Sequence, residues 1–442
     1  MKIIKAGFIQ ALDPAKSDIF DYEYPPLGIL YISGYLKKYL YVKNIFLADT
    51  VQSLIEQKPD IAGISSNSFN FKEAITISEE IKKHLSIPVI IGGPHISILP
   101  YSLPDTADIG VTGEGEETMK ELLEIYMRDG TFHTEKLSSV KGIVYREGNI
   151  KKVTPARESI KPLDRIPLPD RSLCCETDWT PCIITSRGCA YKCKFCSLSS
   201  CIQTFRSFTV KHIKEELFEI INRIESYPHV RILDDVFALN IKKLEKIKNF
   251  ILEHSFQKKV TFDCSVRADL FNEEVCKILK DMNVTRILLG AESGSDRILK
   301  YYRKGQTVED NQRVLDLCND YGIEVTASFI IGAPPETEED LKETYNFIRK
   351  NRSKFWNVHV HPLDPLPGTE IWNYAKKRGF VTDYDEEIKS VNLSEYLSDE
   401  LFREYLKSFL ELICFDVEKH FTVAQKLMED FYSDQLPVTG DQ

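Results

Sequence analysis

Short apolar runs that alternate with amphipathic helical patterns constrain the fold of this chain more than any other feature. In the first 150 residues the runs are IIKAGFI, NIFLAD, IAGISS, PVIIGG and ADIGVTG. Such continuous runs are typical of parallel strands buried on both faces. The patterns between them space apolar side chains three and four residues apart, as in Ala74, Ile77, Ile81 and Leu85, or Met119, Leu122, Leu123 and Tyr126. Residues 1–150 are therefore predicted to form a doubly wound α/β domain, with its ligand crevice at the carboxyl ends of the strands.

Prolines interrupt this pattern between residues 151 and 181, where we predict an extended linker. Beyond it the alternation resumes with CIITS, HVRIL, KVTFDCSV, TRILLG, EVTASFIIG and WNVHVHPL, and a helical stretch follows each of the first five. These units predict a partial (β/α)6 barrel over residues 182–380, with an active site at its carboxyl-end loops. Residues 381–442, which begin with the acidic stretch DYDEE, are predicted to be a helical C-terminal segment with an apolar stripe of Leu401, Tyr405, Phe409 and Leu412.

Charge and hydropathy argue against two classes of function. Lysine and arginine number 57 and aspartate and glutamate 67, so the net charge is −10. This balance disfavours an extended surface for nucleic acid. No stretch approaches the ~18 consecutive apolar residues of a transmembrane helix, and the N-terminus does not resemble a secretory leader. We therefore expect a cytoplasmic protein with no membrane span and no nucleic-acid partner.

The cysteines are unevenly distributed, because none precedes Cys174 and seven of the eleven lie between Cys174 and Cys201. This clustering fits metal ligation in a reducing compartment better than a disulfide framework. Cys189, Cys193 and Cys196 follow the first apolar run of the second half. Thiolates are soft ligands that select iron-sulfur clusters, zinc or copper. Structural zinc needs a fourth ligand, for which Cys201 is the nearby spare thiol, whereas a 4Fe-4S cluster on three cysteines leaves one iron open to bind a small molecule.

The spacing Cys-x3-Cys-x2-Cys, with Phe195 before the last cysteine, resembles the signature of the radical S-adenosylmethionine (SAM) superfamily. The resemblance implies that Cys189, Cys193 and Cys196 hold a 4Fe-4S cluster, that SAM chelates its fourth iron, and that Phe195 lies beside the adenine. In that family an electron from the cluster cleaves SAM to methionine and a 5'-deoxyadenosyl radical, which abstracts hydrogen from the substrate. A one-electron reductant such as flavodoxin or ferredoxin is then an expected partner.

Other strand ends resemble the SAM-binding loops of the same family. By this resemblance, Asp234 after the second barrel strand lies near the SAM amino group, and Arg267 after the third pairs with the SAM carboxylate. Gly290 and Glu292 after the fourth strand resemble the element whose acid contacts the ribose hydroxyls. Ile331, at the end of the fifth, resembles the element that flanks adenine. An ordinary salt bridge is the alternative interpretation of Arg267.

Three loops at the predicted crevice of the first domain carry small or polar residues. They follow its third, fourth and fifth strands and contain Ser65, Ser66 and Asn67, then Gly92, Gly93 and Pro94, then Gly113, Glu114 and Gly115. Glycines let a ligand approach the backbone, and hydroxyls with helix N-termini can hold a phosphate-bearing tail. Together these loops resemble the cobalamin-binding domain fused to many radical SAM enzymes, which implies cobalamin as a further cofactor. The Asp-x-His-x-x-Gly motif of other cobalamin-binding domains is absent, so His95 is interpreted as a loop residue rather than a cobalt ligand.

The resemblance implies a cobalamin-dependent radical SAM methyltransferase that acts on an unactivated carbon or on phosphorus of a small, natural-product-like molecule. A cyclisation or rearrangement with the same cofactors is one alternative, and a non-enzymatic zinc protein is another. The methylthiotransferase branch is disfavoured because it needs cluster cysteines in the N-terminal half, and none precedes Cys174. The prediction is thus a Rossmann-like cobalamin-binding domain, a linker, a partial radical SAM barrel and a helical C-terminal segment.

Overall fold

The computed structural model describes residues 3–12, 24–42, 44–174, 179–201, 204–223, 229–382 and 391–413. The contacts group the chain into two compact units, residues 1–190 with 196–227 and 366–388, and residues 191–195 with 228–365 and 389–442. The acidic stretch DYDEE and everything beyond residue 413 lie outside the described residues.

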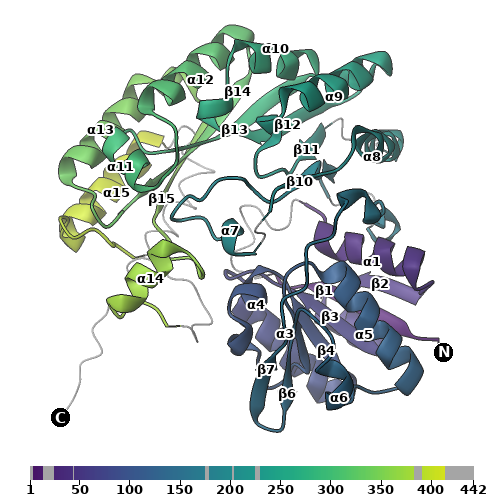
Figure 1. Cartoon of the computed structure of the whole chain (residues 1–442). Coiled ribbons are helices and arrows are strands. Elements are labelled where there is room, and N and C mark those ends of the chain that lie inside the picture. The colour runs from purple at the N-terminus through teal and green to yellow at the C-terminus, as the bar shows by residue number, and fades with distance from the viewer. Residues whose placement is uncertain are drawn as a thin grey trace, which may run out of the picture. The chain divides into compact units, whose positions relative to one another are not determined.

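The first sheet has its strands in the order β2-β1-β3-β4-β5-β6-β7 (Figure 1). The five strands predicted for the first domain are present and pair in parallel. Their bounds are Lys5–Gln10 (β1), Asn44–Ala48 (β2), Ile61–Ser65 (β3), Val89–Gly92 (β4) and Ile109–Val111 (β5). Two more strands, β6 (Ile143–Glu147) and β7 (Ile150–Val153), extend the sheet as an antiparallel hairpin that was not predicted. Gly148 supplies the positive φ of its tight turn.

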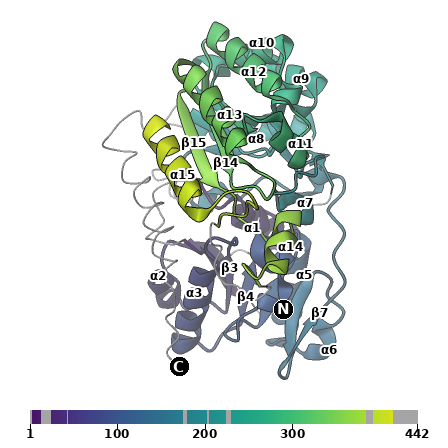
Figure 2. The same ribbon diagram turned by 90° about the vertical axis from the view of Figure 1, so that its left-hand side faces the viewer.

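Helices cover both faces of this sheet, as the apolar runs predict. One face packs against α1 (Leu27–Tyr39) and α5 (Gly115–Asp129), and the other against α2 (Val51–Glu56), α3 (Phe71–His84) and α4 (Pro94–Ile98). Figure 2 shows α3 and α5 on opposite sides of the strands. The core positions predicted for α3 and α5 are buried, except Leu85, which follows the last turn of α3 and is half-buried. A short helix, α6 (Thr134–Leu137), precedes the hairpin.

The second sheet has the order β15-β14-β13-β12-β11-β8, and its strands match the six apolar runs predicted after the linker. Their bounds are Cys182–Ile183 (β8), His229–Ile232 (β11), Thr261–Val266 (β12), Val284–Glu292 (β13), Glu324–Ile331 (β14) and Asn357–Pro362 (β15). Neighbouring strands from β11 to β15 are parallel. Helices follow the first five strands in the chain, namely α8 (Val210–Arg223), α9 (Ile241–Glu253), α10 (Glu273–Asp281), α11 (Asp296–Tyr301) with α12 (Val308–Tyr321), and α13 (Glu338–Lys350). The predicted partial (β/α)6 barrel is therefore confirmed.

Two further helices lie towards the C-terminus, α14 (Glu370–Lys377) and α15 (Asp399–Ile413). The second confirms the predicted C-terminal helix, but Phe409 is the one residue of the predicted stripe that is fully buried. Phe402, Leu406, Phe409 and Leu410 are buried, whereas Leu401, Tyr405 and Leu412 are half-buried. Both stripes repeat at helical spacing in the sequence, so only packing selects between them. The ring of Phe409 contacts Tyr345 of α13 at 5.7 Å between centroids.

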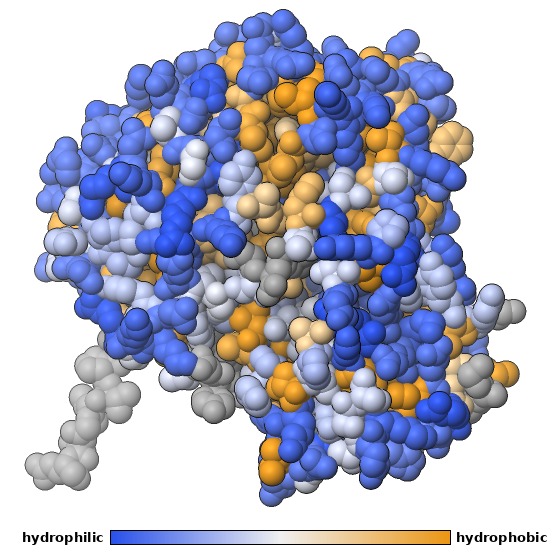
Figure 3. Space-filling view, in the orientation of Figure 1, coloured by the Kyte–Doolittle hydropathy of each residue, from blue (hydrophilic) through white to orange (hydrophobic). Residues whose placement is uncertain are grey.

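Among the described residues, no helix is long and apolar enough to cross a bilayer. Figure 3 shows hydrophilic residues over most of the face that it displays, with one larger group of apolar residues in its upper middle and smaller groups elsewhere.

Gly93 provides a test of the first sheet. Its φ is +109°, and an added Cβ would lie 2.0 Å from the carbonyl oxygen of Ser66. We expect Gly93→Ala to lower the free energy of unfolding by about 2–3 kcal/mol, because the backbones of two packed loops would have to separate. Gly28→Ala in α1 is the control, since nothing lies within 4 Å of its added Cβ. That variant should be as stable as the wild type or more stable by about 0.5–1 kcal/mol. Urea denaturation measures both variants, and an equal loss of unfolding free energy in the two would contradict this account.

Candidate functional site

The loops after β3 and β4 meet at the carboxyl edge of the first sheet, because these two strands are neighbours. Ser65 lies opposite Gly92 in the register, and the backbone N–H of Ser66 donates to the carbonyl of Gly92 at 3.0 Å. Gly93 then passes too close to Ser66 for any side chain. Four of the residues predicted to bind cobalamin are thus brought together.

Buried polar atoms without a protein partner also gather at this edge. Within the described residues they are Gln10 Oε1 at the end of β1, Ser66 Oγ after β3 and His95 Nε2 after β4. Strands β1, β3 and β4 are consecutive in the sheet. An unsatisfied buried polar group costs about 1–3 kcal/mol, so a ligand with hydrogen-bonding groups is favoured here. The amide-fringed ring of a corrinoid fits this requirement.

His95 is a core histidine rather than an exposed ligand. It lies in α4, not in a loop as predicted, because Pro94 begins a helix there. The imidazole is fully buried and stacks on Phe71 at 3.8 Å between centroids, while its Nδ1 lies 3.1 Å from Ser68 Oγ. Burial lowers the pKa of His95 to about 4, so the ring is neutral at pH 7.

The other residues predicted to bind cobalamin at this crevice differ in their exposure and in their contacts with the protein. Pro94 and Gly113 are exposed, and Gly113 holds a φ of +74°. Gly115 begins α5. The Oδ1 of Asn67 accepts a hydrogen bond from the backbone N–H of Phe69 at 2.8 Å, so this side chain shapes its own turn. Their contacts with cobalamin stay predictions.

Glu114 is engaged by other parts of the protein. Its carboxylate accepts hydrogen bonds from Arg187 Nη1 at 3.0 Å, from both Nη atoms of Arg206 at 2.9 Å, and from the backbone N–H of Ile160 at 2.9 Å. Burial by itself raises the pKa of Glu114, but the hydrogen bonds from Arg206 and the charge of Arg187 outweigh it and hold the pKa below its usual range. A direct contact of Glu114 with cobalamin stays a prediction.

The predicted cluster ligands lie in the loop between β9 (Ser186–Arg187) and α7 (Leu198–Cys201). Cys189, Cys193 and Cys196 are partly buried and form no disulfide. In the described parts of the chain, no three of His, Cys, Asp and Glu form a group that could ligate one metal ion. A 4Fe-4S cubane binds each thiolate through a different iron, so its ligands are spaced more widely than those of tetrahedral zinc.

The zinc alternative depends on Cys201. It is the thiol nearest to the loop that could complete a four-ligand site. Burial raises the pKa of the Cys201 thiol to about 11. A bound metal ion deprotonates a thiol that coordinates it, so metal analysis, rather than this shift, separates the cluster from the zinc alternative.

Arg267, predicted to pair with the SAM carboxylate, lies beside Cys193. Its Nη1 donates to Cys193 Sγ at 3.8 Å, and its guanidinium stacks on the ring of Tyr191, with Cζ 3.4 Å from the centroid. Nε donates to Asp269 Oδ1 at 3.0 Å, and Nη2 donates to the carbonyl of Lys304. This permanent charge would offset the negative charge of thiolates and sulfides. Asp269 and Tyr191 were not identified from the sequence, where no motif distinguishes them.

Glu292 ends β13 in a strained conformation. Its φ is +62°, and the register between β13 and β14 shifts between Gly290 and Glu292. Such a backbone costs about 1–3 kcal/mol and is common at functional sites, as are bulges. The carboxylate pairs with Lys304 Nζ at 2.6 Å, and less than a tenth of either side chain is exposed. An added Cβ at Gly290 would lie 2.5 Å from Glu292 Oε1, so glycine makes room for this ion pair.

Lys304 contacts both Arg267 and Glu292, the two residues predicted to bind the carboxylate and the ribose of SAM. Its Nζ binds Glu292, and its carbonyl accepts from Arg267. Gln306, two residues further, donates to the carbonyl of Gly290 at 2.8 Å. The turn after α11 therefore links the ends of β12 and β13. No sequence signal identified it, because its function depends on strands far away in the chain.

The remaining predicted SAM contacts are placed as follows. Asp234 is buried just after β11. The ring of Phe195 makes an edge contact with Tyr302 at 5.0 Å between centroids. Ile331 has no exposed surface, whereas the neighbouring Ile330 is partly exposed on the other face of β14. Their contacts with SAM stay predictions.

Two histidines of β15 were missed. The register places His359 beside Ser328 and His361 beside Ile330, and the two rings stack at 5.9 Å between centroids. Both side chains are partly exposed and alternate with buried valines, so they lie on the face of the sheet opposite its packed core. Burial lowers the pKa of His361, which favours the neutral imidazole. The alternation in WNVHVHPL is the sequence signal that could have found this pair.

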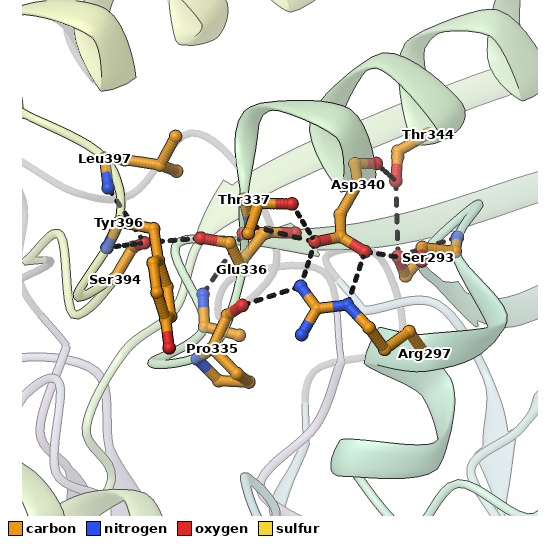
Figure 4. A network of polar contacts seen from close by, with 12 residues as sticks. Ser293, Arg297, Pro335, Glu336, Thr337, Asp340, Thr344, Ser394, Tyr396 and Leu397 are labelled. Atoms are coloured by element: carbon orange, nitrogen blue, oxygen red, sulfur yellow. Dashed lines mark hydrogen bonds and ion pairs between the residues drawn. The ribbon is translucent and has the colours of Figure 1, made fainter.

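A polar network joins the loops after β13 and β14 (Figure 4). Asp340 in α13 accepts from Ser295 Oγ at 2.7 Å and from Arg297 Nε at 3.1 Å. Burial opposes ionisation, but the hydrogen bonds hold the pKa of Asp340 at about 2. Ser394, from the segment before α15, donates to the carbonyl of Glu336 at 2.6 Å. The network therefore fixes both loops and ties part of the C-terminal segment to them.

Comparison with known proteins agrees with this geometry. The model of the radical SAM superfamily matches residues 183–348, and that of the B12 binding domain matches residues 19–123. The chain is 30% identical over 369 residues to an uncharacterised methyltransferase of Pyrococcus horikoshii, across 79% of this chain and 78% of that protein. This chain belongs to the radical SAM superfamily. It is an enzyme, and its N-terminal domain is a B12-binding domain.

Two further comparisons place the enzyme among its relatives. It is 27% identical to the anaerobic magnesium-protoporphyrin IX monomethyl ester cyclase of Rubrivivax gelatinosus, across 82% of this chain and 68% of that protein. The solved structure of the cobalamin-dependent SAM radical enzyme OxsB, with aqua-cobalamin and SAM bound, is similar at a TM-score of 0.67 and 23% identity. That similarity covers 89% of this chain and 58% of OxsB. The predicted family, fold class and cofactors, a 4Fe-4S cluster, SAM and cobalamin, are confirmed.

The ligand assignment can be tested by exchanging single cysteines. We expect Cys193→Ala to abolish iron binding and SAM cleavage, because two thiolates cannot hold the cubane. Cys201→Ala is the matched control, and it should retain iron, since Cys201 is not one of the three proposed cluster ligands. Iron and sulfide content after anaerobic reconstitution measures both. Full iron content in the Cys193 variant, or loss of metal in the Cys201 variant, would contradict the assignment.

Proposed function

We propose that this radical SAM enzyme is a cobalamin-dependent methyltransferase that acts on an unactivated carbon or on phosphorus of a small, natural-product-like molecule. The proposal rests on the presence of a B12-binding domain and a radical SAM domain in one chain. This chain also aligns over most of its length with a protein named a methyltransferase. When bound, the cluster and SAM supply a radical that takes hydrogen from the substrate, and cobalamin supplies the methyl group.

The chain's own residues would bind and orient these groups. Cys189, Cys193 and Cys196 would hold the cluster, and the guanidinium of Arg267 would balance its charge from 3.8 Å away from Cys193 Sγ. Lys304 holds one carboxylate oxygen of Glu292, which leaves lone pairs free to accept hydrogen bonds from ribose hydroxyls. Asp234, Gly290, Phe195 and Ile331 complete the proposed SAM site.

Cobalamin would occupy the carboxyl edge of the first sheet. The loops with Gly93 and Gly113 admit a close approach to the backbone, and the unpartnered atoms of Gln10 and Ser66 supply buried polar groups. None of these groups carries a charge at pH 7, which suits the neutral amides around the corrin ring.

Substrate and partners follow from the same chemistry. The stacked rings of His359 and His361 offer hydrogen-bonding groups on the same face of the second sheet, and burial favours the neutral imidazole of His361. We propose that they contact the substrate.

Cleavage of SAM consumes an electron, so we also propose a one-electron carrier such as flavodoxin or ferredoxin as a partner. The cysteines of the described residues form no disulfide, which is consistent with the proposed reducing, cytoplasmic environment.

Isotope transfer tests the proposed reaction. Reduced, reconstituted enzyme with cobalamin and SAM labelled with 13C at the methyl group should place that methyl group on cobalamin and release 5'-deoxyadenosine. Mass spectrometry measures both products. Release of 5'-deoxyadenosine without any label on cobalamin would instead favour a cyclisation or rearrangement, as the name of the Rubrivivax relative suggests.

The ribose contact can be tested by affinity. Glu292→Gln should weaken SAM binding roughly 10- to 100-fold, because hydrogen bonds to a charged group contribute about 1.5–3 kcal/mol. Iron content should be unchanged. Glu324→Gln is the control, since its ion pair with Arg286 lies at the exposed start of β14. Calorimetric titration with SAM that finds equal affinity in wild type and the Glu292 variant would remove Glu292 from the site.

A further inference from the structure

The loop that carries the cluster cysteines is bracketed by a two-stranded ladder. β9 pairs antiparallel with β10 (Arg206–Ser207), and Arg187 lies directly opposite Arg206. Cys189 follows Arg187 by two residues, which places their Cα atoms within ~7 Å of each other. The position and charge of this ladder therefore affect Cys189, the first of the proposed cluster ligands.

Both arginines of the ladder converge on one carboxylate. Arg206 grips Glu114 with two Nη atoms at 2.9 Å, and Arg187 Nη1 reaches the same carboxylate at 3.0 Å. Arg187 Nη2 also pairs with Glu116 Oε1 at 2.7 Å, and its guanidinium lies 5.0 Å from the centroid of the Tyr31 ring. The four charged side chains are 4–12% exposed.

The charges within this group cancel. Two guanidinium groups face the carboxylates of Glu114 and Glu116, so the buried group has no net charge. Two like charges held side by side in a ladder repel each other strongly where water is excluded, unless a counter-ion lies between them. Glu114 fills that place, and it accepts a further hydrogen bond from the backbone N–H of Ile160.

Glu114 also belongs to a loop with another proposed task. It precedes α5, between Gly113 and Gly115, at the carboxyl end of β5. That loop is part of the proposed cobalamin site. One side chain therefore connects the cobalamin-binding edge of the first sheet to the strand that leads into Cys189.

We propose that Glu114 is a positioning residue for the iron-sulfur cluster, which holds the base of the cysteine loop in place and neutralises the arginine charge beside it. Removal of the Glu114 charge would leave one excess positive charge two residues from Cys189, which favours the reduced cluster because reduction adds negative charge. The inference rests on the proposed cluster ligands, but not on the identity of the substrate.

The experiment measures the midpoint potential of the reconstituted cluster by EPR-monitored redox titration. Glu114→Gln should shift the potential to a more positive value. The double variant with Arg206→Met restores charge balance and should return the potential towards that of wild type. Glu117→Gln is the control, because its partner Arg165 is half exposed, and it should leave the potential unchanged. If Glu114 contributed to stability alone, its substitution would lower the free energy of unfolding, but Arg206→Met would not reverse a shift of the midpoint potential.

Hydrogen exchange of the cluster-free protein tests the positional part separately. Amides of residues 186–189 and 206–207 should exchange faster in Glu114→Gln and in Glu114→Asp, whose shorter side chain cannot make the same contacts. Because Glu114→Asp keeps the charge, it should retain the wild-type potential if it assembles a cluster. A wild-type potential and wild-type exchange in Glu114→Gln would overturn the proposal. A wild-type protein that assembles no cluster would overturn the proposed function instead, and the exchange experiment would still decide the role of Glu114.

Discussion

When helices cover both faces of a sheet of parallel strands, a ligand can reach the sheet only at its edges. In such a sheet every strand ends at the same edge when the chain returns through a helix, so the loops after successive strands become neighbours. Both sheets of this enzyme obey that constraint. The loops after β3, β4 and β5 gather at one edge of the first sheet, and the ends of β12, β13 and β14 gather in the second. Side chains more than 20 residues apart thereby share one site.

Buried charges give these loops a defined shape. Glu292 with Lys304, Arg267 with Asp269, and Glu114 with Arg206 are each paired at 2.6–3.0 Å. A buried charge without a partner is costly, so the pairs of Glu292 with Lys304 and of Glu114 with Arg206 each hold two separate segments together, while Asp269 fixes Arg267 within one loop. The same pairs orient groups that would meet SAM or the cluster. Rigid, charged loops of this kind suit an enzyme that must confine a reactive radical.

Periodicity predicted most of the secondary structure, because burial on both faces selects continuous apolar runs for strands and three-to-four spacing for helices. The eleven predicted strands are all present. The hairpin of β6 and β7 was missed, because its mostly exposed second strand, IKKV, carries no apolar run. Of the stripe predicted on α15, only Phe409 is fully buried, because two apolar stripes that share this residue lie side by side and only the packing of the helix selects between them.

The sequence by itself determined the family, the cofactors and the identity of the cysteine ligands that we propose, because ligand type and spacing within one loop are local properties. It also located Arg267, Glu292 and the glycine loops at strand ends. Only the tertiary structure decided what these residues contact. Lys304 beside Glu292, Asp269 beside Arg267, and the two arginines around Glu114 depend on which strands lie next to each other. Pairing of that kind is set by the packing of distant segments, and no short stretch of sequence encodes it.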